Sequence, residues 1–196
     1  MRVSEERPIL DAMNARPEQR TDGTDGRDGG DRKDPVDAIA EQWAGVRPDL
    51  DTTAMEVFGR VHRLSRAMGD RVEKAYARYG IARGEFDVLA TLRRAGEPYT
   101  LSPRQLSGTL MLTTGGMTGR LDKLERAGLL RRSPDPHDRR GLQVTLTEQG
   151  LAVVDQAVGA GLAVQTEALA ALPPDRARQL TGLLRELLLA TERSQP

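Results

Sequence analysis

Apolar residues recur at helical spacing along most of the chain. Val36, Ile39, Ala40 and Trp43 follow i, i+3, i+4, i+7 spacing, which predicts a short helix over residues 35–46. The same period predicts further helices over residues 52–79, 85–95, 148–171 and 175–192. Because the apolar stripe of the longest of these helices is nearly continuous, that helix can pack against its own domain and also against a second chain.

Residues 101–127 predict two short helices in close succession. Ser102 suits the N-cap of the first helix, and Gln105 three residues later can complete a capping box. A turn is expected at residues 113–116, where two threonines and two glycines interrupt the apolar period. The second helix follows this turn and runs to about residue 127, where Gly128 is placed to cap its C-terminus.

After the second helix the apolar residues alternate with polar ones, which is the period of a strand. One strand is predicted over residues 129–132 and another over residues 142–147, separated by the turn-rich residues 134–138. Helix, turn, helix and a two-stranded hairpin together predict a winged helix-turn-helix. The expected fold class is mainly α with a small β-hairpin wing, and the apolar N- and C-terminal helices are expected to form a dimer.

Composition divides the chain into four parts. Residues 1–34 are rich in Gly and Asp and lack an apolar period, which predicts a disordered N-terminal tail. Residues 35–100 are expected to form N-terminal helices, residues 101–147 the winged helix-turn-helix, and residues 148–196 C-terminal dimerisation helices. The hydrophobic share of 38% is sufficient for one well-packed core.

Composition also excludes several classes of function. The chain has no cysteine, so disulfides, thiolate metal sites and cysteine nucleophiles are excluded. The two histidines, His62 and His137, lie far apart in the sequence, and we expect neither a metal site nor a cofactor. The sequence shows no catalytic constellation, so we do not expect an enzyme. It also lacks an apolar run of about 20 residues and a signal peptide, which favours a cytoplasmic protein without membrane contact.

Charge is concentrated in the predicted winged helix-turn-helix. Residues 101–147 hold eight Lys and Arg against four Asp and Glu, a net charge of +4, although the whole chain is neutral. Because neutralisation of phosphates supplies most of the sequence-independent affinity for DNA, this local excess indicates binding to double-stranded DNA.

Several side chains of that segment are placed to contact DNA. The second helix would lie in the major groove, and Arg140, or Arg139 beside it, would enter the minor groove. Asp138 would hold the arginine, although Arg140 could also form only a salt bridge within the wing. The expected DNA-binding residues are Ser102, Arg104, Gln105, Thr113, Thr114, Thr118, Arg120, Lys123, His137, Asp138, Arg139 and Arg140. A dimer would read a near-palindromic operator.

Two ordered motifs carry a resemblance to a known family. Residues 117–125 read MTGRLDKLE, and residues 138–147 read DRRGLQVTLT. They resemble the recognition helix and the wing of the MarR family of bacterial transcription regulators, and the resemblance extends over residues 35–192. Within that family the chain looks most like the PecS-type, urate-responsive branch. Gly119 departs from the branch, where Asn or Arg is common, and removes one polar contact to the bases.

The resemblance implies a ligand site. In that branch the ligand is held by a Trp of the N-terminal helix, an Asp and two Arg, and the matching residues here are Trp43, Asp87, Arg120 and Arg132. Trp43 can stack on a planar ring, Arg120 can bind an anion and Asp87 can accept an N–H. The implied effector is urate or a related purine or aromatic anion, and xanthine, a nucleotide or a phenolic acid stay open.

Each of these four residues also has a plainer structural explanation. Arg120 could contact phosphate or pair within its helix, and Asp87 could be a surface or capping charge. Trp43 could belong to the core or to an interface, and Arg132 could be solvated at the end of a strand.

The sequence therefore indicates a homodimeric transcription regulator that responds to a small-molecule effector. Repression of a palindromic site is the simplest mode, because a bound dimer blocks the site sterically. Ligand bound at Arg120 would pull on the second helix and change the half-site spacing, which would release the DNA. The alternative is a constitutive or architectural DNA-binding protein with no ligand response.

Overall fold

A computed structural model describes residues 32–110, 114–136, 138 and 141–193 of the chain. The chain divides into two units, one ending at Ser65 and the other beginning at Arg66. The elements are α2 (Pro35–Val46), α3 (Thr53–Ala77), α4 (Arg83–Arg94), β1 (Thr100–Leu101), α5 (Pro103–Leu110), α6 (Thr114–Arg126), β2 (Leu130–Pro134), β3 (Leu142–Leu146), α7 (Glu148–Leu169) and α8 (Pro174–Arg193).

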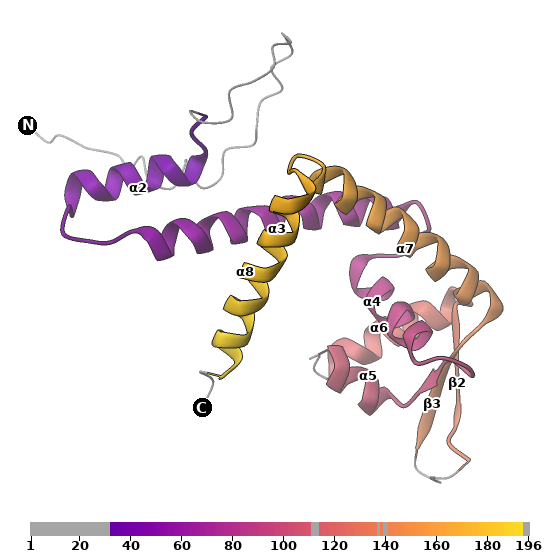
Figure 1. Cartoon of the computed structure of the whole chain (residues 1–196). Coiled ribbons are helices and arrows are strands. Elements are labelled where there is room, and N and C mark those ends of the chain that lie inside the picture. Colours follow the sequence, from indigo (N-terminus) through magenta and orange to yellow (C-terminus); the bar gives the residue numbers. More distant parts are fainter. Residues whose placement is uncertain (1–31, 111–113, 137, 139–140, 194–196) are drawn as a thin grey trace, which may run out of the picture. The chain divides into compact units, whose positions relative to one another are not determined.

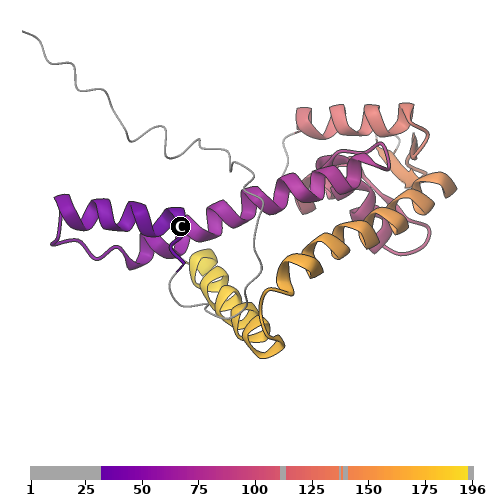
Figure 2. The ribbon, with the colours of Figure 1, turned by 90° about the horizontal axis from the view of Figure 1, so that it is seen from above.

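The first unit contains α2 and the beginning of α3, which lie side by side (Figures 1 and 2). The helix predicted over residues 35–46 is confirmed. It starts at a capping box in which Asp34 accepts N–H groups of the first turn and Asp37 binds the Asp34 N–H at 2.7 Å. Asp34 thus belongs to the folded unit rather than to the predicted tail, and most of that tail lies outside the described residues. Val36 is buried where Gly59 lets the two helices approach.

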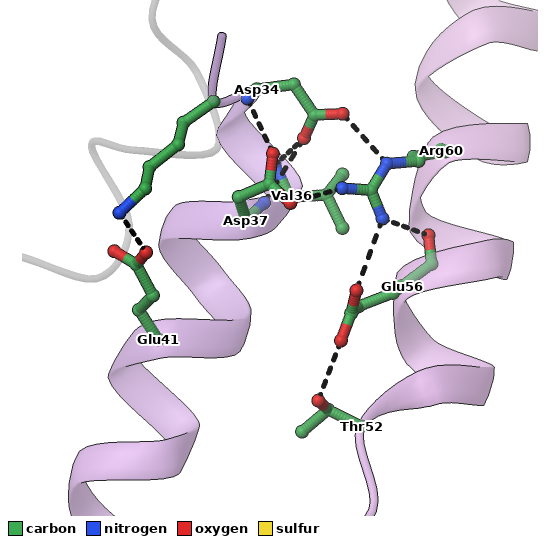
Figure 3. Close-up of polar contacts among 8 residues, drawn as sticks. Asp34, Val36, Asp37, Glu41, Thr52, Glu56 and Arg60 are labelled. Atoms are coloured by element: carbon green, nitrogen blue, oxygen red, sulfur yellow. Dashed lines mark hydrogen bonds and ion pairs between the residues drawn. The ribbon is translucent and has the colours of Figure 1, made fainter. Parts of the chain in front are cut away.

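Arg60 of α3 joins the two helices of this unit through their acidic residues (Figure 3). Its Nε donates to Asp34 Oδ2 at 2.8 Å, and its Nη2 donates to Asp37. Its Nη1 lies 3.5 Å from Glu56 Oε2 on its own helix. One guanidinium therefore binds both members of the capping box that starts α2, so helix start and helix docking depend on the same side chain.

Arg60→Ala is expected to loosen α2 from α3. The ion pairs are partly exposed, so solvent screening makes the expected effect local to this docking contact rather than a loss of the fold. Trp43 on α2 is the only tryptophan of the chain, and its fluorescence therefore reports on this helix directly. We expect lower fluorescence anisotropy and stronger acrylamide quenching in the variant.

Arg47→Ala is the matched control, because Arg47 pairs at 2.7 Å with Asp49 two residues away and does not join the helices. Equal quenching of Trp43 in the Arg60 and Arg47 variants would show that Arg60 does not hold α2.

The second unit contains a three-stranded antiparallel sheet in the order β1-β3-β2. β3 pairs with β2 through Leu130 opposite Leu146, and with β1 through Thr100 opposite Thr145. The predicted fold class, mainly α with a small β wing, is confirmed. The prediction of a two-stranded hairpin was incomplete because β1 has only two residues, too few to show an alternating pattern.

α4 lies at the centre of the second unit, in contact with α5, α6, α7 and β3. Val88, Leu89 and Leu92 on α4 are fully buried. The other elements add Leu106, Met117, Leu121, Leu124, Leu130, Val144 and Val154 to the same core. The wing and both helices of the helix-turn-helix are therefore positioned by one central helix.

The beginning of α6 differs from the prediction. A turn was expected at residues 113–116, but α6 begins at Thr114 and includes Gly115 and Gly116, while Thr113 lies outside the described residues. Glycine is tolerated in a first helical turn when packing fixes the helix, and Met117 is 1% exposed in the core. The predicted end is confirmed, since Gly128 has a φ of 71° after the last turn.

The C-terminal helices leave apolar surface exposed. In the described part of the chain, no residue of α8 is buried. Its large exposed apolar residues are Leu183, Leu184, Leu188 and Leu189, and α7 adds Val158, Leu162 and Leu169. None of the described helices is long and apolar enough to cross a membrane.

Candidate nucleic-acid interface

The first helix of the helix-turn-helix starts at the capping box that the sequence predicts. The Ser102 N–H donates to Gln105 Oε1 at 2.8 Å, and the Gln105 N–H donates to Ser102 Oγ at 3.2 Å. The side chains of Ser102 and Gln105, which the sequence predicts to contact DNA, thus stabilise the start of α5. Arg104 lies exposed in the same first turn, where a cation can reach a phosphate.

The exposed side of α6 carries small residues. Thr118 and Gly119 are exposed, and a Cβ at Gly119 would meet no described atom within 4 Å. Thr113 and the side chain of Thr114 lie outside the described residues, so their predicted contacts stay predictions. A helix with such an uncrowded surface can approach the floor of a major groove closely.

Arg120 of α6 contacts the first turn of α4. Its Nη1 donates to the Gly84 carbonyl oxygen at 3.3 Å. A Cβ at Gly84 would lie 2.6 Å from Arg120 Cζ, so only glycine leaves room for the guanidinium there. The structure therefore does not support pairing of Arg120 within its own helix, and a base contact would need a different side-chain conformation.

Lys123 contacts the same turn of α4. Its Nζ lies 2.6 Å from Glu85 Oε1, and the Glu85 side chain is only 8% exposed. Glu85 did not stand out in the sequence because the helix was predicted to start at residue 85. With the actual start at Arg83, Glu85 is the third helical residue, a position that often completes a capping box.

Arg132 of β2 binds two carboxylates of α6. Its guanidinium lies 2.7 Å from Asp122 Oδ1 and 2.5 Å from Glu125 Oε2, and its backbone N–H donates to Glu125 Oε1 at 2.8 Å. The explanation as a solvated strand-end arginine is therefore wrong. The guanidinium holds the pKa of Glu125 below its usual value, and Glu125 in turn raises the pKa of Arg132.

This ion pair predicts acid sensitivity. Because the pKa of Glu125 is lowered in the folded state, its contribution is present above the unfolded value of 4.5 and is lost as the pH falls through the lowered folded value. Arg132→Ala should cost on the order of 1 kcal/mol at neutral pH after screening. It should also flatten the loss of stability on acidification, as measured by urea unfolding at several pH values.

Arg126→Ala serves as the control, because Arg126 donates to the Asp122 backbone carbonyl at 3.1 Å rather than to Glu125. The same acid profile in wild type and in the Arg132 variant would contradict the role of the pair.

Asp87 lies on α4 one turn beyond Gly84 and is half-buried. Burial raises the pKa of the Tyr76 phenol, and the Asp87 carboxylate adds to this effect, so Asp87 acts on Tyr76. Trp43 belongs to the other unit and is 42% exposed on α2. The structure thus brings Arg120 to the helix that carries Asp87, while assembly of the four-residue ligand site stays a prediction.

The loop between β2 and β3 closes tightly. The Gly141 N–H donates to the Asp138 carbonyl at 2.8 Å, and the Asp135 N–H donates to the Gly141 carbonyl at 3.0 Å. A Cβ at Gly141 would lie 2.9 Å from Asp135 Cβ. His137, Arg139 and Arg140 lie outside the described residues, so their predicted DNA contacts are not described.

A cavity of about 280 Å³ lies between α4 and α7. Tyr76 and Phe86 stack on its wall with ring centroids 4.1 Å apart, and Arg93 at its edge pairs with Asp155 at 2.9 Å. The sequence did not reveal this cavity, because its lining comes from three helices, α3, α4 and α7, that lie far apart in the chain. Among the described residues, no group of three or more His, Cys, Asp or Glu could hold a metal ion.

Comparison with known proteins gives consistent matches. A family model described as MarR family matches residues 79–141. The HTH-type transcriptional regulator PecS of Dickeya dadantii is 38% identical over 149 residues, which are 76% of this chain and 90% of PecS. The multiple antibiotic resistance protein MarR of Salmonella typhimurium is 31% identical, over 67% of this chain and 90% of that protein.

Solved structures show the same likeness. A mutant MarR from E. coli complexed with operator DNA superposes with a TM-score of 0.60 at 25% identity, covering 74% of this chain and 97% of that chain. Wild-type MarR from E. coli in its apo form superposes with a TM-score of 0.58 at 29% identity, covering 66% of this chain and 95% of that chain.

Proposed function

The chain belongs to the MarR family of transcription regulators, and we propose that it is a ligand-responsive repressor that binds a palindromic operator as a homodimer. The observation that carries this proposal is the match to PecS, 38% identical over 90% of that regulator, together with the winged helix-turn-helix of residues 101–147. The family assignment agrees with the expectation that the chain is not an enzyme.

The arrangement of the second unit supports DNA binding. α5 starts at a capped turn that carries the exposed Arg104, and α6, the proposed recognition helix, exposes Thr118 and Gly119. The segment that contains both helices and the wing has the net charge of +4 on which phosphate binding depends. The proposed orientation places α6 in the major groove and the wing in the minor groove.

Exposed leucines support a dimer. None of the described residues of α8 is buried, and the side chains of Leu183, Leu184 and Leu188 are each more than two-fifths exposed. A stripe of this kind gains stability when a second copy covers it. Since a two-fold dimer reads two half-sites, the operator should be a near-palindrome.

We further propose that the effector is urate or a related planar anion. Arg120 of α6 donates to the carbonyl of Gly84 on α4. Asp87 lies on α4 one turn after Gly84. An anion bound there would attract the Arg120 guanidinium and repel the Asp87 carboxylate. Because Arg120 is part of α6, its movement would shift the recognition helix and favour a form of the dimer with altered half-site spacing.

Footprinting on the DNA upstream of its own gene tests the regulator. We expect protection of one near-palindrome, and light scattering should give twice the mass of one chain. Uniform protection without a defined site would favour the architectural alternative instead.

A gel shift with millimolar urate tests the effector, with the uncharged purine adenine as the control. Release of the DNA by urate but not by adenine is the expected result. An intact complex in both lanes would reject the urate assignment while leaving operator binding in place.

A further inference from the structure

We propose that Glu85 is a positioning residue for the recognition helix, and that Lys123 serves this contact rather than a DNA phosphate. The inference rests on the proposed function, since it concerns how α6 is presented to DNA. It reassigns Lys123, which the sequence alone places among the DNA contacts.

Glu85 connects two elements with one buried carboxylate. The residue is 6% exposed, although it carries a charge. Its Oε2 accepts the Ala82 N–H at 2.9 Å, which caps the start of α4. Its Oε1 lies 2.6 Å from Lys123 Nζ on α6. Both oxygens therefore have a partner, and the partners come from different helices.

A second cation of α6 contacts the same place. Arg120 stands three residues before Lys123, so both lie on one face of the helix. Arg120 contacts Gly84 and Lys123 contacts Glu85, which are neighbours in the first turn of α4. Two adjacent residues of α4 thus contact both cations on this face of α6.

Electrostatics makes Glu85 the critical member of this contact. The N-terminus of a helix carries a partial positive charge, which disfavours nearby cations. Arg120 and Lys123 both approach the N-terminus of α4, so a carboxylate is needed there to make their approach favourable. A Lys123 that left for a phosphate would leave the buried Glu85 with its cap alone, which is costly for a charge.

The change in operator affinity caused by Glu85→Gln has opposite signs for the two roles of Lys123, partner of Glu85 or phosphate contact. We compare operator affinity of wild type, Glu85→Gln and Lys123→Gln. Gln at position 85 keeps an oxygen for the Ala82 N–H but presents no charge to Lys123. If Glu85 positions α6, Glu85→Gln should weaken binding roughly tenfold. If Lys123 is a phosphate contact that Glu85 only restrains, the same variant should bind more tightly.

The salt dependence gives a second, independent readout. The association constant K falls as salt rises, and loss of one phosphate contact makes the slope of log K against log salt shallower by about 0.9. We expect Lys123→Gln to weaken operator binding as Glu85→Gln does, and to leave this slope unchanged. Lys123→Arg, which keeps the charge, should bind the operator with wild-type affinity. The double variant should be no worse than either single one. Arg126→Gln is the same change of charge on α6 at a residue that donates to the Asp122 backbone carbonyl rather than to α4, and it gives the purely electrostatic baseline.

Tighter or unchanged binding by Glu85→Gln, or a reduced salt slope in Lys123→Gln, would overturn the inference. If Glu85→Gln fails to fold, as judged by circular dichroism, Lys123→Gln alone decides, because it leaves the Glu85 cap in place. Failure of the wild type to bind its operator would instead reject the proposed function.

Discussion

Gly150→Ala is expected to destabilise the second unit severely. Gly150 lies in the first turn of α7 and is buried against the connection between α6 and β2. A Cβ there would stand 1.8 Å from the carbonyl oxygen of Leu129, a backbone atom that cannot rotate away. The same carbonyl accepts the Thr147 N–H at 3.2 Å, so the first turn of α7 would have to move away from Leu129. We expect a loss of about 3 kcal/mol or more in the free energy of unfolding.

Gly159→Ala is the matched control on the same helix. A Cβ at Gly159 would meet no described atom within 4 Å, and alanine favours a helix over glycine. We expect a gain of about 0.4–1 kcal/mol. Urea unfolding at one fixed protein concentration compares the two variants. Similar values for both would contradict the close approach of α7 to Leu129.

Arg140→Ala is expected to have the largest effect on DNA binding. The sequence predicts that Arg140, or Arg139 beside it, enters the minor groove, where a narrow groove concentrates negative potential around an inserted arginine. Loss of such a contact costs about 1–3 kcal/mol, or roughly ten- to hundredfold in affinity. Fluorescence anisotropy with a labelled operator measures the change.

Arg131→Ala removes the same charge from the same hairpin. Arg131 is exposed on β2 and faces Thr145 across the sheet, close to the base of the wing. We expect a weaker effect, limited to screened attraction for phosphate. Equal losses in the two variants would show that Arg140 contributes charge without entering the groove.

The sequence predicts the helices of this fold well because each has an apolar stripe of its own. Met117, Leu121 and Leu124 mark α6, and all three are buried. The sequence predicts the start of α6 less well, because propensity argues for a turn at Gly115 and Gly116 and only packing overrides it. β1 escaped detection, since a two-residue strand has no period and exists only through its pairing with β3.

The candidate site is predictable in its residue types but not in its contacts. Arg120 and Lys123 are cations of one helix, and the sequence alone assigns both to DNA and Arg120 also to the ligand. Their partners on α4 stand more than 35 residues earlier in the chain, and no local pattern joins the two positions. Arg132 shows the same limit, because it is the contact between β2 and α6 that places it beside Glu125.

Specificity of DNA binding tests the central proposal most directly. The measurement compares the affinity for DNA upstream of the gene with that for a shuffled sequence of the same composition, at about 150 mM salt, where non-specific binding is weak. An operator-specific regulator should prefer its site at least about a thousandfold. Equal affinity for the two sequences, with the same salt dependence, would contradict the account and establish an architectural DNA-binding protein instead.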